Sequence, residues 1–263
     1  MKQRVLTGVV AGALYLAFLL YGSYPFAIMA AMIAGIAFTE TALMDRMKYS
    51  SGPVLIGMFF VIAIVLFPFF SDKGSFEVLF IRLLILFILV MAVMTFFSKN
   101  HFDYTQAAYL TFSALYISIP FYLLVQMRFH SLALVLFVQI TIWATDSGAY
   151  FVGRSFGKHK LAPHISPNKT IEGSAGAIIV ALLTAIIFQL IAPAMVFHSW
   201  FELFIAALII SVAGQMGDLV ESAVKRHFNV KDSGSILPGH GGLFDRFDSL
   251  IFVLPLLYLT GII

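Results

Sequence analysis

Long apolar stretches separated by short polar segments run along the whole chain. An α-helix needs about 20 apolar residues to cross the hydrocarbon core of a bilayer, and most of the stretches reach that length. The pattern predicts nine membrane-spanning helices, at about 5–21, 25–44, 53–70, 78–97, 105–126, 130–150, 173–195, 200–221 and 245–261. The fifth contains Pro120, and the ninth begins among charged residues.

The composition indicates that lipid is the main solvent of this chain. Of its 263 residues, 61% are apolar and 11% are charged, and the mean hydropathy is +0.98. A water-soluble domain carries about 25% charged residues. We therefore expect an all-α, polytopic integral membrane protein. The absence of cysteine excludes disulfide bonds and cysteine-ligated metals.

Basic residues are divided unequally between the two sides that nine spans define. With a cytoplasmic N-terminus, the extracytoplasmic side receives only Lys73, Arg82 and Arg128. The cytoplasmic side receives Lys2, Arg4, Arg46, Lys48, Lys99, Arg154, Lys158, Lys160, Lys169, Lys225, Arg226, Lys231 and Arg246. The positive-inside rule then predicts a cell-membrane protein with a cytoplasmic N-terminus and an extracytoplasmic C-terminus.

Polar residues are concentrated in the second half of the chain. Segments 151–172 and 222–244 are separated by two spans, so we expect both on the cytoplasmic face. No other loop is long enough to build a site. Residues 1–130 are therefore interpreted as a transmembrane scaffold and residues 131–263 as the catalytic region.

Five acidic residues stand near the predicted ends of the last spans: Asp146, Asp218, Glu221, Asp245 and Asp248. A carboxylate at membrane depth costs at least about 2.5 kcal/mol, which makes each a functional candidate. Asp245 and Asp248 share a helix face, as do Asp218 and Glu221. Paired carboxylates repel unless a cation lies between them, and oxygen ligands favour Mg²⁺ or Mn²⁺ over zinc. Capping of the ninth helix is the alternative for Asp245 and Asp248.

Two acidic residues, Glu221 and Glu40, each have two possible roles. Glu221 and Lys225 are four residues apart, so a local ion pair is as reasonable as a catalytic role for Glu221. Glu40 lies inside the second span without an obvious partner. It is either a structural hydrogen-bonding group or a residue that lines a cavity.

The segment 238–242 places three glycines around His240. Glycine lets backbone N–H groups approach a ligand closely, and next to a helix N-terminus this pattern is typical of an anion site. It is also typical of a tight turn. Four basic residues bracket the segment: Lys225, Arg226, Lys231 and Arg246. They are either membrane-interface anchors or, with the nearby carboxylates, contacts for a polyphosphate and its Mg²⁺.

The other polar segment leads into the seventh span through residues 166–173. Pro167 and Asn168 predict a turn. Lys169 is a candidate phosphate contact, while Thr170 and Glu172 are also suitable caps for the helix that follows.

Residues 222–248 read SAVKRHFNVKDSGSILPGHGGLFDRFD. This stretch resembles the signature of the phosphatidate cytidylyltransferases, or CDP-diacylglycerol synthases, with no departure from it. The matching positions are Ser222, Lys225, Arg226, Lys231, Asp232, Gly234, Pro238, His240, Gly241, Gly242, Asp245, Arg246 and Asp248. Segments 146–150 and 166–173 also match. The specific resemblance covers residues 143–248, and residues 1–130 match only as a multi-span region.

The resemblance implies a reaction and its components. Phosphatidic acid would attack the α-phosphorus of CTP in phospholipid biosynthesis, giving CDP-diacylglycerol and pyrophosphate. It also implies dependence on Mg²⁺, an all-helical nine-span fold and a homodimer in the lipid membrane. Mn²⁺ in place of Mg²⁺, and an added monovalent cation such as K⁺, stay open. No nucleic-acid partner is expected.

The resemblance also implies roles for individual residues. Asp218, Asp245 and Asp248 would be metal ligands, with Lys225, Arg226 and Arg246 as further catalytic residues. The substrate-binding residues would be Asp146, Ser166, Lys169, Thr170, Glu172, Ser222, Lys231, His240, Gly241 and Gly242. The nucleophile is already an anion, so neutralising and aligning two anions is the main task.

Two other functions remain as alternatives. A cation-coupled transporter would use Asp146, Asp218 and Glu40, and it predicts ion-dependent uptake into liposomes. A polyprenol-type lipid kinase that uses CTP would release CDP and a phosphorylated lipid instead of pyrophosphate. Product analysis therefore separates these enzymes.

Overall fold

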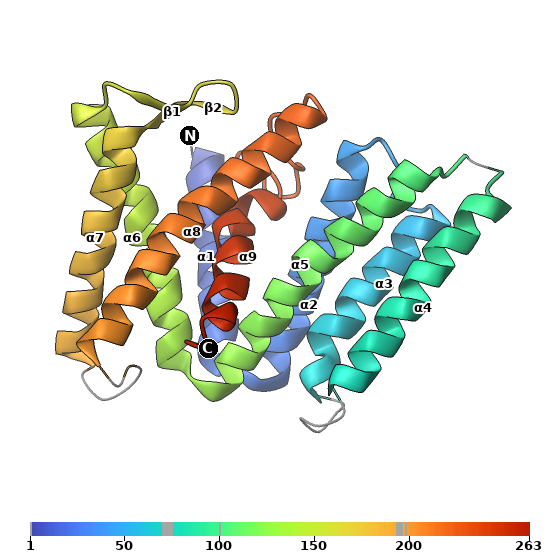
Figure 1. Cartoon of the computed structure of the whole chain (residues 1–263), viewed down its shortest axis with the longest axis horizontal. Helices are drawn as coiled ribbons and strands as arrows, with labels where there is room; N and C mark the ends of the chain where they lie inside the picture. The colour runs from blue at the N-terminus through green and yellow to red at the C-terminus, as the bar shows by residue number, and fades with distance from the viewer. Residues whose placement is uncertain (1, 70–75, 100, 193–196, 198) are drawn as a thin grey trace. The chain divides into compact units, whose positions relative to one another are not determined.

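The computed structural model describes residues 2–69, 76–99, 101–192, 197 and 199–263. In these ranges the chain forms nine α-helices (Figure 1): α1 (Lys2–Tyr21), α2 (Ser23–Met44), α3 (Gly52–Leu66), α4 (Phe76–Phe97), α5 (Tyr104–His130), α6 (Leu132–Phe156), α7 (Ile171–Ile191), α8 (Trp200–His227) and α9 (Phe244–Leu259). A 3-10 turn, η1 (Phe67–Phe69), follows α3. The predicted all-α class is confirmed.

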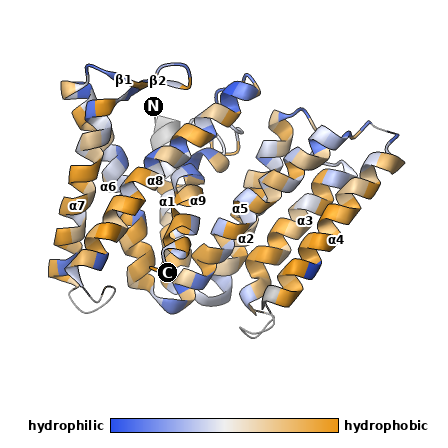
Figure 2. Cartoon of the chain, in the orientation of Figure 1, coloured by the Kyte–Doolittle hydropathy of each residue, from blue (hydrophilic) through white to orange (hydrophobic). Residues whose placement is uncertain are grey.

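The helices of the described residues are those of a multi-pass membrane protein. Seven of them, α2 to α8, are long and apolar enough to cross a bilayer, with η1 completing the span of α3. The apolar part of α1, Leu6–Tyr21, and the 16 residues of α9 are shorter. Figure 2 shows mostly hydrophobic helix bodies and a hydrophilic end of α8. Lys73, which was counted on the extracytoplasmic side, lies outside the described residues.

Three helices end several residues beyond the limits that hydropathy predicted, and the first is α5, which ends at His130 instead of about residue 126. α6 continues to Phe156 instead of about residue 150, and α8 continues to His227 instead of about 221. The added turns of α6 and α8 carry basic residues, which interact favourably with a helix C-terminus. As a result Asp146 and Asp218 lie within their helices and not at the ends.

A two-stranded antiparallel hairpin joins α6 to α7. Its strands are β1 (Lys160–Ala162) and β2 (Ser166–Thr170), and Lys160 pairs with Thr170. The turn predicted at Pro167 and Asn168 was wrong, because both residues lie within β2. Proline is compatible with this position because each strand of a two-stranded sheet has a free edge that needs no N–H donor.

The chain divides into two compact units. Unit 1 contains Met1–Gln126 and Val230–Arg246, and unit 2 contains Met127–Asn229 and Phe247–Ile263. The signature segment after α8 therefore folds with the N-terminal helices. The assignment of a scaffold role to 1–130 and a catalytic role to 131–263 stays a prediction.

Unit 1 is held together by close helix contacts. Gly57 of α3 packs against the ring of Phe38 in α2, where a side chain would not fit. The hydroxyl of Tyr109 in α5 donates to the carbonyl of Thr41 in α2, at 2.9 Å. Small residues let transmembrane helices approach each other, and a hydrogen bond between helices adds to their packing. Thr41 directly follows Glu40, so these contacts fix the part of α2 that carries this carboxylate.

Unit 2 is also held together by close helix contacts at glycines. A Cβ at Gly148 of α6 would lie 2.8 Å from the side chain of Val180 in α7. A Cβ at Gly217 of α8 would lie 2.6 Å from the backbone oxygen of Asp248 in α9. Glycine at 217 thus lets the start of α9 approach α8 at the acidic residues.

Candidate active site

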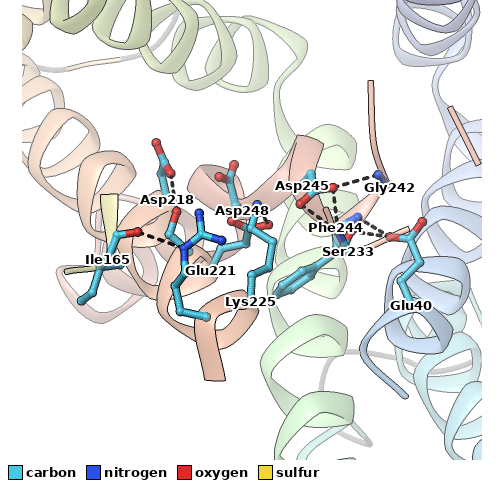
Figure 3. Close-up of polar contacts among 12 residues, drawn as sticks. Glu40, Ile165, Asp218, Glu221, Lys225, Ser233, Gly242, Phe244, Asp245 and Asp248 are labelled. Atoms are coloured by element: carbon cyan, nitrogen blue, oxygen red, sulfur yellow. Dashed lines mark hydrogen bonds and ion pairs between the residues drawn. The ribbon is translucent and has the colours of Figure 1, made fainter. Parts of the chain in front are cut away.

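Three carboxylates gather within unit 2. Asp218 and Glu221 share one face of α8, and Asp248 lies in the second turn of α9. One oxygen of each lies within 4.8 Å of the others (Figure 3). Glu221 is buried, whereas Asp218 and Asp248 are half-buried. Two consecutive helices, α8 and α9, build this group, and Gly217 permits their approach.

Two lysines partly neutralise the group. The Lys169 ammonium of β2 lies 2.7 Å from Oδ2 of Asp218. The Lys225 ammonium lies 2.7 Å from Oε1 of Glu221, which confirms the predicted local ion pair. The side chains of Glu221 and Lys225 are only 2% and 13% exposed. Removing one partner would therefore leave a poorly solvated charge.

Asp146 and Ser222 belong to the same surroundings. Asp146 of α6 interacts electrostatically with Asp218 and Lys169. The Ser222 hydroxyl, one turn after Asp218, donates to its Oδ1 at 3.3 Å. Oδ1 of Asp248 accepts the backbone N–H of Ser249 at 2.7 Å. Residues from α6, β2, α8 and α9 therefore converge here.

The charges and donor atoms of this group fit a divalent metal ion. When fully ionised, Asp146, Asp218, Glu221 and Asp248 have four negative charges against two on the lysines, which leaves two in excess. The donors are all carboxylate oxygens, which hard cations such as Mg²⁺ prefer. Asp218 and Asp248 were predicted as ligands, whereas Glu221 was not.

The hairpin lies beside the C-terminal end of α8. Nε of Arg226 donates to the backbone carbonyl of Ile165, which lies between the two strands, at 3.4 Å. Together with the pair of Lys169 and Asp218, this contact brings the polar segment after α6 to the carboxylates. Ser166, the first residue of β2, is half-buried.

Thr170 has the capping role that was left open as an alternative, whereas Glu172 has a different structural role. The Thr170 hydroxyl accepts the N–H of Gly173 at 3.1 Å and caps α7. The Glu172 carboxylate accepts the backbone N–H groups of Lys158 and His159, and it lies 2.6 Å from Nδ1 of His159. Both residues thus anchor the hairpin that carries Lys169.

The glycine-rich segment forms a tight turn in unit 1. Gly239 and Gly241 have φ angles of 78° and 79°, which other residues rarely adopt. The Asp245 carboxylate reaches back and accepts the N–H groups of Gly242, at 2.8 Å, and Ser233, at 3.0 Å. These bonds agree with the capping alternative for Asp245. Its role as a metal ligand stays a prediction.

Glu40 also belongs to this part of unit 1, and sequence reasoning had found no partner for it. Its buried carboxylate accepts the backbone N–H groups of Leu243 and Phe244 and the hydroxyl of Ser233 (Figure 3). Of the two interpretations left open, that of a structural hydrogen-bonding group is supported.

The remaining predicted contacts are more loosely defined. His240 is half-buried and lies against Gly8 of α1, where a Cβ would be 3.0 Å from its Nε2. Within the described residues its buried Nδ1 has no hydrogen-bond partner. Lys231 and Arg246 are exposed. The substrate-binding roles of His240 and Lys231 and the catalytic role of Arg246 stay predictions.

Comparison with known proteins places the whole chain in one family. The profile of the cytidylyltransferase family matches residues 2–263. The chain belongs to the cytidylyltransferase family.

This cytidylyltransferase-family chain is similar over its length to three bacterial proteins named phosphatidate cytidylyltransferase. The protein from Bacillus subtilis (strain 168) is 43% identical over 98% of this chain and 96% of its own length. Those from Staphylococcus epidermidis (strain ATCC 12228 / FDA PCI 1200) and Staphylococcus aureus (strain COL) are 43% and 42% identical, each over 98% of this chain and 97% of its own length. The similarity therefore includes both units.

Proposed function

We propose that this protein is a phosphatidate cytidylyltransferase, a nucleotidyltransferase that makes CDP-diacylglycerol for phospholipid synthesis. The observation that carries the proposal is the end-to-end similarity to proteins of that name. The cluster of Asp218, Glu221 and Asp248, with Lys169 and Lys225 beside it, supports the proposal because carboxylates suit a metal ion and lysines suit phosphate.

The reaction requires alignment of two anions more than base catalysis. A phosphate oxygen of phosphatidate bonds to the α-phosphorus of CTP. The bond from that phosphorus to the oxygen bridging it to the β-phosphate breaks, and pyrophosphate leaves with the electron pair. Because the nucleophile is already ionised at neutral pH, neutralisation and in-line positioning lower the barrier.

The predicted metal ligands and Lys169 have distinct parts in this proposal. Asp218 and Asp248, with Glu221 beside them, would hold Mg²⁺ or Mn²⁺, and Asp245 is the third predicted ligand. When bound, this ion supplies positive charge to the phosphates. Lys169 would contact phosphate from its place on β2.

The other predicted site residues keep their roles as proposals. Lys225, Arg226 and Arg246 would offset the charge that develops during transfer. The residues proposed to surround the substrates are Asp146, Ser166, Thr170, Glu172, Ser222, Lys231, His240, Gly241 and Gly242. Thr170 and Glu172 act through the hairpin, because their side chains already bond to backbone N–H groups.

The chemistry of the substrates indicates at which face of the membrane the site opens. CTP is water-soluble and phosphatidate resides in the bilayer, so the site is proposed to open at the cytoplasmic face of the cell membrane. The uneven distribution of basic residues supports this orientation. A homodimer is part of the same proposal, on the resemblance to the family alone.

The test uses purified protein in lipid nanodiscs with CTP labelled at the α-phosphate, phosphatidic acid and MgCl₂. We expect labelled CDP-diacylglycerol and an equal amount of pyrophosphate, and EDTA should stop both. Release of CDP with a phosphorylated lipid would indicate a kinase. Ion-dependent uptake without nucleotide turnover would indicate a transporter. Failure to form CDP-diacylglycerol from any phosphatidic acid would overturn the proposal.

A further inference from the structure

The carboxylate of Glu40 occupies the N-terminus of α9. Backbone N–H groups of Leu243 and Phe244 donate to the two oxygens of Glu40, at 3.0 and 2.9 Å. The Ser233 hydroxyl donates to Oε2 at 3.0 Å. A helix N-terminus attracts anions such as phosphate. Here Glu40, only 4% exposed, takes the place that a phosphate could otherwise occupy.

Two glycines of the signature leave room for this carboxylate. A Cβ at Gly234 would lie 2.5 Å from Oε1 of Glu40, and its three nearest atoms all belong to Glu40. A Cβ at Gly242 would collide with Oε2 of Glu40 and the hydroxyl of Ser233. Neither glycine has a positive φ. The space taken by Glu40, and not backbone conformation, therefore explains the missing side chains.

The same segment links Glu40 to Asp245. Ser233 donates its hydroxyl to Glu40 and its backbone N–H to Asp245. Gly242 abuts Glu40 and donates its N–H to Asp245. The two carboxylates thus hold one piece of backbone from two sides. A change at Glu40 would shift the groups that orient Asp245.

We propose that Glu40 is a positioning residue for cytidylyl transfer. It anchors the segment from Ser233 to Phe244 and thereby sets the orientation of Asp245 at the start of α9. It also closes the N-terminus of α9 to the phosphates of CTP. The inference rests on the proposed function for the role of Asp245, whereas the contact between Glu40 and the glycines stands without it.

The first test replaces Glu40 with glutamine, an isosteric side chain whose NH₂ group would face the N–H donors. A group displaced by about 1 Å can lose about 10²-fold in rate, so we expect a fall of that size in kcat per folded molecule. The Mg²⁺ concentration for half-maximal activity should rise several-fold. Thr39→Val is the matched control, because the Thr39 hydroxyl bonds within α2 to the carbonyl of Gly35. That variant should retain both values.

A purely structural role for Glu40 predicts a different result. Activity would then fall only in proportion to the folded fraction, and the Mg²⁺ response of the folded enzyme would be unchanged. Either that result or full activity in folded Glu40→Gln would overturn the positioning role.

The second test is a double-mutant cycle of Gly234→Ala with Glu40→Asp, measured by thermal unfolding. Gly234→Ala should lower the midpoint clearly in the wild-type background. It should cost much less beside the shorter aspartate, since the three atoms nearest to the new methyl group all belong to Glu40. Equal costs in both backgrounds would overturn the proposed contact. This readout needs no turnover, so it remains decisive even if the wild-type protein makes no CDP-diacylglycerol.

Discussion

Two carboxylates of unit 2, Asp218 and Glu221, and two of unit 1, Glu40 and Asp245, are stabilised by different partners. In unit 2, Asp218 and Glu221 pair with the ammonium groups of Lys169 and Lys225. In unit 1, Glu40 and Asp245 accept backbone N–H groups of the signature segment. A lysine on a flexible stem can exchange one anion for another, whereas a backbone N–H is fixed by the fold.

This difference separates two kinds of acidic residue that look alike in a sequence. The carboxylates of unit 2 can give their oxygens to a metal ion while Lys169 turns to a phosphate. Those of unit 1 cannot leave without exposing unsatisfied N–H donors, each of which costs about 1–3 kcal/mol when buried. The contacts of Asp218 and Glu221 therefore suit an exchange of partners, whereas those of Glu40 and Asp245 hold backbone in place. The role of Asp245 as a metal ligand stays a proposal.

The largest effect is expected from Asp248→Asn. Loss of one anionic oxygen from the cluster of Asp218, Glu221 and Asp248 should lower turnover by about 10³-fold. This is the upper range for loss of one electrostatic group. The unfolding midpoint should stay near that of the wild type. CDP-diacylglycerol formation at saturating Mg²⁺ is the measurement. Asp103→Asn, an exposed site where Oδ1 accepts the N–H of Gln106, serves as the control. Wild-type rates for Asp248→Asn would refute the metal assignment.

Asp245→Asn should lose a similar amount of turnover but should differ in stability. The asparagine amide would present a donor to the N–H groups of Ser233 or Gly242. We expect a loss of about 1–3 kcal/mol in the free energy of unfolding. Denaturant titration of both variants makes the comparison. Equal stability of Asp245→Asn and Asp248→Asn would contradict the distinction between the units.

Lys169→Met tests whether a lysine partner is exchangeable. The methionine keeps an apolar side chain but removes the ammonium that neutralises Asp218. The site then has one more net negative charge, so metal should bind more tightly while CTP binds more weakly. We expect kcat/KM for CTP to fall about 10²-fold, as for loss of one charge-stabilising group. Half-activation should occur at lower Mg²⁺. Lys99→Met, at an exposed lysine after α4 in unit 1, is the control. A parallel weakening of both ligands would argue against this role.

The smallest effect is expected from Thr170→Ala. Loss of an N-cap hydroxyl costs about 1 kcal/mol. Because Lys169 is the adjacent residue, a modest decrease in rate should accompany the loss of stability. Ser199→Ala removes the cap of α8, where the hydroxyl accepts the N–H of Glu202. That control should lose similar stability without a decrease in rate. Identical rates in both variants would show that the α7 cap does not affect Lys169.

Local sequence patterns were sufficient to predict part of the site. Asp218 and Glu221 are three residues apart, so helix geometry alone placed them on one face. The ion pair of Glu221 and Lys225 followed from the same rule and is confirmed. The helix ends were less predictable, because the last turns of α6 and α8 carry basic residues, which lower the hydropathy at the end of each span.

Long-range contacts could not be deduced in this way. Glu40 and Phe244 are 204 residues apart, and nothing in the sequence around Glu40 identifies its donors. The proximity of Lys169 to Asp218 likewise depends on how β2 and α8 fold within unit 2. The cost of an intramembrane carboxylate indicated that Glu40 mattered, but not what it bound.

By itself, the sequence determined that this chain is a helical, multi-pass membrane protein, because apolar length and scarce charge leave no other solvent than lipid. It also determined the signature that assigns the family. Only the tertiary structure decided the partners: lysines for Asp218 and Glu221, and backbone N–H groups for Glu40 and Asp245. The reason is that helix periodicity acts over a few residues, whereas charge neutralisation depends on which helices pack together.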